Sequence, residues 1–459
     1  MMVASVYPSY RPAKMRWLPL VPEHWNEQRA KTFYREVDER SHTGREELLS
    51  VSHLTGVTPR SQKNVTMFKA ASYVGSKLCR PGDIVVNTLW AWMAALGASK
   101  YAGIVSPAYG VYRPHRTDSF NPAYLDYLLR TRAYVAEYIG RSTGIRASRL
   151  RLYPNQFLDI PLLQPPRPEQ DQIVAYLRTQ DAHIARFIKA KRDLIALLTE
   201  QKLRIIDHAV TRGLDASVNL KSSGIEWLGE VPEHWELRRL KFLASNITNQ
   251  TTTKSHDEIY LALEHVESWT GRARPLAGEV EFASTVKRFV IDDVLFGKLR
   301  PYLAKVTRAA HIGVCVSEFL VLRSRKTLVL PAYLEQLLRC KRVIDLVNSS
   351  TAGAKMPRAD WTFIGDIRLP IPPVGEQHQI LSFITRETKD VDETIQRAND
   401  EIKLIREYRD RLIADAVTGR VDVRGWKPGA DDVVSDDDLA ALGDDEAGAA
   451  DEEEGDGDD

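Results

Sequence analysis

The feature that most constrains the fold of this chain is an internal repeat. The motif W-L-x-x-V-P-E-H-W spans residues 17–25 and returns at 227–235, an offset of 210 residues. Over residues 14–33 and 224–243, nine of twenty aligned positions are identical, whereas unrelated sequences would share about one. The repeat therefore predicts two copies of one architecture within the 459 residues.

Shorter matches continue the repeat downstream, while the offset drifts from 210 to 207. They are Pro-Ala-Tyr-Leu at 122–125 and 331–334, Glu-Gln at 169–170 and 376–377, and Ala-Val-Thr at 209–211 and 416–418. The stretches between them are dissimilar, most of all residues 40–110 against 250–320. We therefore expect one scaffold that carries two different variable regions.

Each half ends in a long segment without helix-breaking residues. No Gly or Pro occurs between Pro168 and Gly213, or between Gly375 and Gly419, and this punctuation is typical of a helix start and end. Apolar residues recur in both segments at spacings of three, four or seven, which indicates a coiled-coil seam. The predicted seam consists of Ile173, Leu177, Ile184, Ile195, Leu198 and Ile205, and of Ile380, Ile384, Val391, Ile402, Ile405 and Leu412.

The two helices are expected to pair with each other in antiparallel orientation, because a globular half is inserted between them. Both are too long to cover a single domain of about 150 residues. The alternative, in which each helix packs only on its own globular half, stays open on periodicity alone.

The regions before each helix mix strands and helices. Strand-like segments lie within 72–113 and 288–323, and helices opened by Pro lie within 122–140 and 331–348. The predicted fold class is therefore α+β, with two duplicated globular domains separated by a long antiparallel two-helix coiled coil.

The net charge of +1 hides an asymmetry along the chain. Residues 431–459 hold fifteen acidic and no basic residues, so the first 430 residues carry 63 basic against 47 acidic side chains. A body this basic is typical of a polyanion binder, and a solvated basic surface is the alternative. The acidic tail, which has no aromatic residue, is predicted to be disordered and could compete with nucleic acid for the basic surface.

The composition and the absence of several sequence motifs argue against several classes of protein. The chain has no run of eighteen apolar residues and no secretory signal, and its three cysteines are far apart, which favours the reducing cytoplasm of a prokaryote over a membrane or an export route. It lacks P-loop, zinc-protease, G-x-S-x-G and dinucleotide-binding signatures. We therefore expect no catalytic residue, no metal and no cofactor in this chain.

The best candidates for DNA contact are two loops that follow the Pro-Ala-Tyr-Leu helices. Residues 141–151 and 349–358 combine Gly, Ser, Thr and basic side chains, which suit close approach to phosphates and hydrogen bonds to bases. A further candidate, Lys298-Leu299-Arg300, follows a predicted strand, where the first half has Asn87-Thr88-Leu89-Trp90. The predicted contact residues are Arg141, Ser142, Thr143, Arg146, Arg149, Arg151, Lys298, Arg300, Thr351, Lys355 and Arg358. Solvated loops with chance basic residues are the alternative.

The repeated Pro-Glu-His-Trp motif carries less chemistry than its residues suggest. His24 and His234 are expected to fix a turn beside the long helices rather than to titrate in a reaction. Trp25 and Trp235 are expected to be core anchors rather than stacking platforms.

Together these motifs resemble the specificity subunit of type I restriction-modification systems over residues 14–425. The carriers are the doubled W-L-x-x-V-P-E-H-W and Pro-Ala-Tyr-Leu motifs, the two basic loops, the Glu-Gln helix starts and the closing Ala-Val-Thr motifs. The resemblance implies a first target recognition domain (1–167), a central spacer helix (168–213), a second target recognition domain (214–374), a C-terminal spacer helix (375–419) and the acidic tail (420–459). The resemblance does not explain the tail.

The resemblance also implies partners. Such a subunit binds a split, asymmetric site on double-stranded DNA and holds two modification subunits, which carry S-adenosylmethionine, with restriction subunits joining the complex. This chain would then supply the address and no catalysis. The alternatives are a single-chain DNA methyltransferase or nuclease with two recognition domains, and a structural protein that assembles through its coiled coil, which would leave the basic body unexplained.

Overall fold

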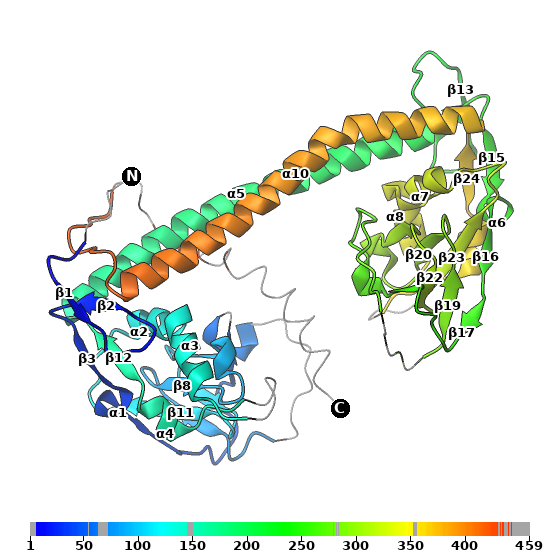
Figure 1. Cartoon of the computed structure of the whole chain (residues 1–459). Coiled ribbons are helices and arrows are strands. Elements are labelled where there is room, and N and C mark those ends of the chain that lie inside the picture. Colours follow the sequence, from blue (N-terminus) through cyan, green and yellow to red (C-terminus); the bar gives the residue numbers. More distant parts are fainter. Residues whose placement is uncertain are drawn as a thin grey trace. The chain divides into compact units, whose positions relative to one another are not determined.

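The computed structural model describes residues 6–53, 55–62, 72–144, 150–278, 280, 282, 284–351, 356–429, 432, 434, 435, 439 and 442. The chain divides into two compact units (Figure 1). Unit 1 joins residues 1–193 to 399–459, and unit 2 is residues 194–398. Most of the acidic tail lies outside the described residues, so its predicted disorder stays a prediction.

The core of unit 1 lies between an antiparallel sheet and short helices. The sheet has the order β4 (Tyr34–Glu36), β11 (Gly110–Pro114), β8 (Ile84–Val86) and β9 (Leu96–Ala98). Helices α2 (Pro122–Leu129), α3 (Arg132–Arg141) and α4 (Pro154–Leu158) pack against it around the buried Tyr112, Tyr124 and Phe157. Two-stranded pairs complete the unit: β1 (Tyr10–Pro12) with β2 (Leu20–Pro22), β3 (Asn26–Arg29) with β12 (Pro161–Gln164), β5 (Leu49–Ser52) with β6 (Gly56–Pro59), and β7 (Lys77–Cys79) with β10 (Gly103–Val105).

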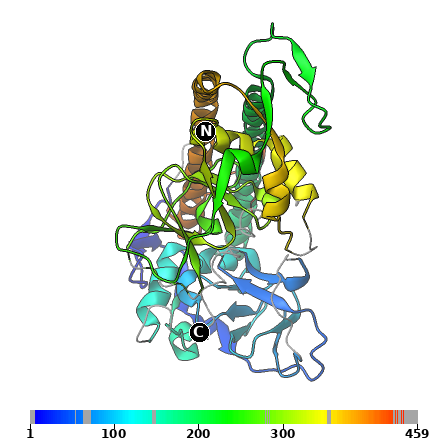
Figure 2. The same cartoon turned by 90° about the vertical axis from the view of Figure 1, so that its right-hand side faces the viewer.

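Unit 2, which faces the viewer in Figure 2, contains a sheet with the same strand order. This order is β16 (Ala244–Ile247), β23 (Phe319–Ser324), β20 (Val294–Gly297) and β21 (Val306–Arg308). A second sheet joins β17 (Gln250–Thr251), β19 (Val286–Phe289), β22 (Gly313–Val316) and β18 (Ile259–Leu261). Three helices complete the unit: α7 (Pro331–Arg339), α8 (Lys341–Ser349) and α9 (Trp361–Asp366). It also contains two strand pairs, β13 (Leu220–Ser222) with β14 (Glu230–Pro232) and β15 (Glu236–Arg239) with β24 (Arg368–Ile371). The two units thus share one strand order in the sheet that begins with β4 in unit 1 and with β16 in unit 2.

Short helical turns link these elements. They are α1 (Ala30–Phe33), η1 (Arg60–Gln62) and η2 (Ala91–Met93) in unit 1, and α6 (Leu240–Leu243), η4 (Leu263–His265) and η5 (Pro301–Leu303) in unit 2.

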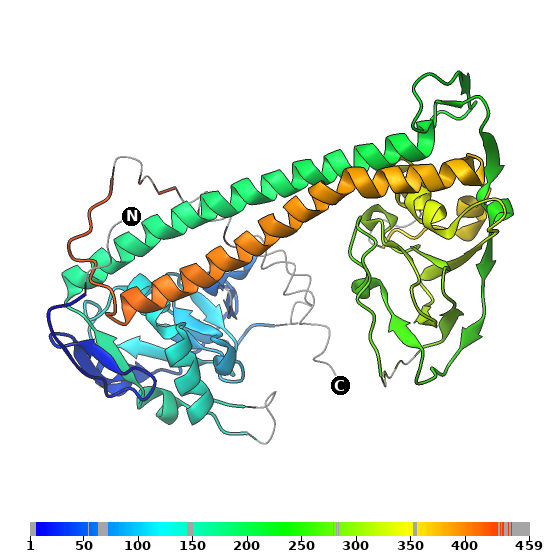
Figure 3. The ribbon, with the colours of Figure 1, turned by 45° about the horizontal axis from the view of Figure 1, so that its top comes forward.

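The two long helices are α5 (Arg167–Arg212) and α10 (Val374–Val417), and they run side by side in each unit (Figure 3). In unit 1, Asp181 lies beside Arg409 and Lys191 beside Glu401; in unit 2, Lys202 lies beside Asp392. Partners of rising number on α5 have falling numbers on α10, so the helices are antiparallel. This confirms the predicted pairing.

The burial of the apolar seam residues changes along the helices. Near each helix start, Ile173 and Leu177 in unit 1 and Ile380 and Ile384 in unit 2 belong to the cores of the globular parts. Ile184 and Ile402 are also buried. The other predicted seam residues are half-buried: Ile195, Leu198, Ile205, Val391, Ile405 and Leu412. Two helices alone cannot enclose their shared seam, whereas a globular layer on one side completes the burial.

The repeated W-L-x-x-V-P-E-H-W motifs fasten the globular parts to the helix starts. In unit 1, Glu169 of α5 accepts hydrogen bonds from the Trp25 indole (2.9 Å) and Tyr7 hydroxyl (2.5 Å) and lies 2.8 Å from His24 Nε2. Unit 2 repeats the contact at Glu376, with Trp235 at 3.0 Å and His234 at 2.8 Å. The predicted roles of both histidines in a turn, and of both tryptophans as buried anchors, are therefore confirmed.

Each unit is also closed by the end of a long helix. In unit 1 the buried Tyr124 hydroxyl donates to the Val417 carbonyl (3.1 Å), and in unit 2 the Tyr333 hydroxyl donates to Val210 (3.0 Å). Beyond these ends, Gly213 and Gly419 have φ of +75°, and a Cβ on Gly419 would lie 2.3 Å from Pro22 Cδ. In each unit, the repeated Tyr, Val and Gly thus join the end of one long helix to the globular part.

Candidate nucleic-acid interface

In unit 2, the structure brings two separate candidate segments together. After β20, Lys298 accepts a backbone hydrogen bond from Ala359 (2.8 Å), and Arg300 donates one to the Pro357 carbonyl (2.8 Å). Leu299 therefore faces Arg358 in an isolated antiparallel bridge. The bridge therefore brings the backbones of Lys298, Arg300 and Arg358 close together, with Arg300 and Arg358 exposed and Lys298 half-buried.

The backbone of this segment is unusual at the exposed Arg300. Arg300 has φ +49° and ψ +60°, a left-handed conformation that glycine or asparagine adopts more readily. Its carbonyl starts the turn η5, which exposes the ring of Tyr302. An arginine and a tyrosine thus project from one tight turn.

One acidic residue moderates this basic cluster. Arg358 donates to Glu318 Oε1 at 2.9 Å, and the Arg358 side chain keeps 56% of its surface exposed. The other oxygen, Glu318 Oε2, is buried and has no hydrogen-bond partner among the described residues. The ion pair therefore orients the Arg358 guanidinium without covering it.

Unit 1 has the corresponding arrangement with different side chains. Leu152 donates to the Thr88 carbonyl (2.9 Å), as Ala359 does to Lys298 in unit 2. Arg151 takes the place of Arg358, and its guanidinium lies 5.4 Å from the Tyr153 ring centroid. The neighbouring turn exposes Leu89 and Trp90 instead of a basic pair. The same position in the two units thus carries apolar chemistry in one and basic chemistry in the other.

Of the remaining predicted contact residues, Thr143 is exposed, whereas Arg141, Ser142 and Thr351 are half-buried. Thr143 and Arg151 exchange two backbone hydrogen bonds (3.1 and 3.0 Å), which hold these two residues side by side. Arg141 is paired with Glu137, the Ser142 hydroxyl oxygen is buried, and the Thr351 hydroxyl donates to the Asn348 carbonyl. Arg146, Arg149 and Lys355 lie outside the described residues.

Sequence reasoning missed the supports behind these segments. The buried Asp293, one residue before β20, accepts two hydrogen bonds from Arg323 (both 2.8 Å), and Asp83 before β8 accepts two from Arg113 (both 3.0 Å). Each aspartate fixes the strand that leads into the surface turn. An offset of 210 residues links both pairs, so a residue-by-residue search of the dissimilar stretches could have found them.

A second repeated support is a buried lysine. Lys287 donates to the Phe319 and Ser317 carbonyls (2.7 and 3.1 Å), and Lys77 donates to the Tyr109 carbonyl (2.9 Å). Burial lowers the pKa of Lys287, and the charge of Lys298 acts in the same direction. These lysines hold neighbouring strands together from inside, so their charge is not available to a ligand.

The buried cysteines Cys79 and Cys315 are poorly suited to nucleophilic chemistry. Burial raises the pKa of Cys79 and of Cys315 to about 12, so neither thiol is a ready nucleophile. Among the described residues, no group of three or more His, Cys, Asp or Glu side chains could hold a metal ion. None of the helices in the described part of the chain combines the length and apolar character that a bilayer crossing requires.

Comparison with known proteins gives a consistent picture. No family model matches the chain. The type I restriction enzyme EcoDI specificity subunit of Escherichia coli is 24% identical over 227 residues, which cover 49% of this chain and 50% of that protein. The putative type I restriction enzyme MjaX specificity subunit of Methanocaldococcus jannaschii is 25% identical over 209 residues, or 42% and 47% of the two chains. The chain thus matches about half the length of these curated relatives.

The fold has a solved counterpart. A chain in the structure described as "Structural basis underlying complex assembly and conformational transition of the type I R-M system" superposes with a TM-score of 0.55. The superposition covers 87% of this chain and 99% of that chain at 15% identity, so it bears on the fold alone. Sequence matches and fold together confirm that this chain resembles the specificity subunits of type I restriction-modification systems.

Proposed function

We propose that this chain is the DNA-specificity subunit of a type I restriction-modification complex. In this proposal it binds a bipartite, asymmetric site on double-stranded DNA and performs no catalysis itself. The observation that carries the proposal is the repeated surface turn, which has Lys298, Arg300 and Arg358 in unit 2 and Leu89, Trp90 and Arg151 in unit 1. Equivalent turns with unlike side chains are what two unlike half-sites require.

Arginine and apolar side chains read different base edges. Arginine forms paired hydrogen bonds with guanine O6 and N7 in the major groove, whereas apolar groups contact the thymine methyl. The two turns are therefore suited to different bases, and the surrounding positive charge supplies sequence-independent attraction to phosphates. In this proposal the acidic tail competes with DNA for that charge.

The partners in this proposal are two modification subunits, which bind S-adenosylmethionine, and restriction subunits that join them in the cytoplasm. Apolar side chains exposed on the paired helices support docking of other proteins. They are Phe187, Leu404 and Tyr408 in unit 1 and Leu194 and Leu197 in unit 2.

The decisive experiment is methylome sequencing of cells with and without this chain. The expected result is the loss of one bipartite adenine-methylation motif when the chain is deleted. If every methylated motif persists, the proposal is wrong. Incubation of the purified chain with DNA and a labelled methyl donor tests the single-chain methyltransferase: label on the DNA without any partner subunit would favour that enzyme.

A further inference from the structure

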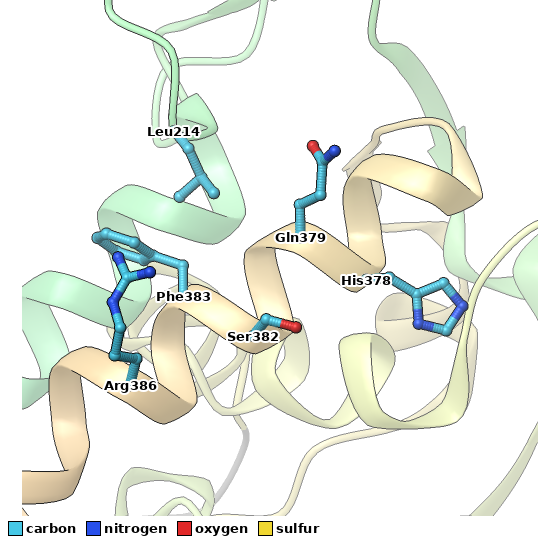
Figure 4. A pocket seen from close by; sticks show the side chains of 6 residues that line it. All are labelled: Leu214, His378, Gln379, Ser382, Phe383 and Arg386. Atoms are coloured by element: carbon cyan, nitrogen blue, oxygen red, sulfur yellow. The ribbon is translucent and has the colours of Figure 1, made fainter.

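The start of α10 in unit 2 borders an open groove that the proposed function does not use. Figure 4 shows its lining side chains: Leu214 from the segment after α5, and Gln379, Phe383 and Arg386 from α10, with His378 and Ser382 completing it. The groove has a volume of about 430 Å³. Leu214 is 39% exposed, and the Arg386 guanidinium lies 5.5 Å from the Phe383 ring centroid.

The internal repeat shows what a surface of this kind holds in unit 1. At the offset of 207 residues, Gln379 corresponds to Gln172 and Phe383 to Tyr176, both on the start of α5. The Gln172 amide donates to the carbonyl of Trp426 (2.6 Å), and the Trp426 ring meets Tyr176 edge to face at 5.5 Å. The preceding Val423 is buried in the core of unit 1. Residues 421–426, in which a tight turn brings the Trp426 amide to the Val423 carbonyl (3.0 Å), therefore cover this surface in unit 1.

Nothing equivalent covers the surface in unit 2 among the described residues. The chain that leaves α5 passes Leu214 and enters β13, which forms the hairpin beyond the helix end in Figures 1 and 2. Gln379 and Arg386 are consequently exposed, and the Gln379 amide has no hydrogen-bond partner within the described part of the chain. The aromatic ring and the amide that hold a peptide segment in unit 1 are both present here, without the segment.

We infer that this groove is a docking site for a tryptophan- or tyrosine-bearing turn of a protein partner. The partner's aromatic ring would pack against Phe383 in the T-shaped geometry that such pairs prefer, and one of its backbone carbonyls would accept from Gln379. The guanidinium of Arg386 would flank the same ring by a cation–π contact. The chain's own segment 421–426 is already packed on α5, and the chain after α5 is committed to β13, so the occupant comes from another polypeptide.

A photo-cross-linking experiment on the full chain tests the inference. The probe is a peptide with the sequence of residues 420–428, in which photoreactive benzoylphenylalanine replaces Trp426. We expect its cross-links in the tryptic fragment 369–386, at least a fivefold lower yield there with Phe383→Ala or Gln379→Ala, and an unchanged yield with Phe242→Ala, an exposed aromatic residue of the same unit. Cross-links in the fragment that ends at Arg178 would report exchange at the unit 1 site and are counted separately.

Three results would overturn the inference. The first is the absence of cross-links in fragment 369–386, and the second is an equal yield with Phe383→Ala. The third is a concentration-dependent dimer in sedimentation that Phe383→Ala abolishes, because this would assign the groove to a second copy of the chain. Competition supplies a positive check: excess unlabelled peptide should suppress the cross-link, and the same peptide with Ala for Trp426 should not.

Discussion

The indole of Trp25 donates a hydrogen bond to Glu169 Oε1 over 2.9 Å, across 144 residues of sequence. This contact joins the repeated motif at residues 17–25 to the first turn of α5, and Trp235 makes the same contact with Glu376. The carboxylates are not equally enclosed, since the Glu169 side chain is 6% exposed and the Glu376 side chain 23%. The two helix starts should therefore respond differently to the loss of the carboxylate.

Replacing Glu169 by Ala should destabilise unit 1 by about 2–4 kcal/mol, because it leaves the buried Tyr7 hydroxyl and Trp25 indole without an acceptor. Glu376→Ala should cost less, about 1–2 kcal/mol, since Glu376 is itself 23% exposed and its partner His234 is 44% exposed to water. Urea unfolding monitored by tryptophan fluorescence measures both. Glu407→Ala, an exposed position on α10, is the control. Equal losses for Glu169 and Glu376 would contradict the role of burial.

The ion pairs between the long helices should also differ in strength. Arg409 donates two hydrogen bonds to Asp181, whose side chain is only 5% exposed, whereas Lys202 meets Asp392, which is 33% exposed. Arg409→Ala should therefore cost about 2–4 kcal/mol, because it leaves a buried carboxylate without its cation. Lys202→Ala should cost less than about 1 kcal/mol. Thermal unfolding of both variants checks this order, and the reverse order would refute it.

The acid stability of unit 2 should depend in part on Asp292. Hydrogen bonds from Lys326 and Arg308 lower the pKa of this carboxyl group below its usual value. The stabilisation is therefore present above pH of about 4 and is lost as the pH falls through the lowered pKa. Asp292→Asn, which tolerates the left-handed φ of +72°, should cost up to about 1 kcal/mol at pH 7 and less near pH 2.

Urea titrations of wild type and variant at the two pH values measure this difference. Asp257→Asn is the control, since the side chain of Asp257 is 91% exposed. A difference between wild type and Asp292→Asn that is as large at pH 2 as at pH 7 would contradict the assignment to the ion pairs.

The basic turn of unit 2 should contribute directly to DNA affinity. Arg300→Ala and Arg358→Ala should each weaken binding to the specific site, by about tenfold where the side chain contacts a base, or lower the salt-dependence slope by about 1 where it contacts a phosphate. Glu318→Gln should act in the opposite direction, because it removes the carboxylate that pairs with Arg358. Fluorescence anisotropy distinguishes these outcomes when it is measured between about 50 and 200 mM salt, a range in which phosphate contacts make the affinity strongly salt-dependent. Arg397→Ala on α10, 74% exposed, is the control.

The helical spacer should set the distance between the half-sites if the proposed function is right. Inserting seven residues into both α5 and α10 keeps the seam in register and lengthens the helices by about 10 Å. The preferred unread spacer should then change by about three base pairs, or binding should be lost. Selection from random DNA measures the spacer, and an unchanged spacer would refute this role. Insertion of four residues, which breaks the seam, is the matched disruptive variant.

The sequence by itself determined the repeat and the two long helices, and it favoured their antiparallel pairing. These follow from residue identity at a fixed offset and from apolar periodicity, both of which are local properties of the chain. The sequence also determined that His24 and Trp25 serve a turn and a core, because such residues are more often structural than chemical.

Only the tertiary structure decided which candidate residues lie together. The bridge between Leu299 and Arg358 joins segments about sixty residues apart, and its formation depends on Asp293, Lys287 and the strand order of the sheet behind it. The tertiary structure also decided that Trp426 covers the surface at Tyr176, whereas the equivalent surface at Phe383 is open. The equivalent residues are alike in both halves, but what packs on them depends on where the following segment of chain goes, and no local pattern encodes that path.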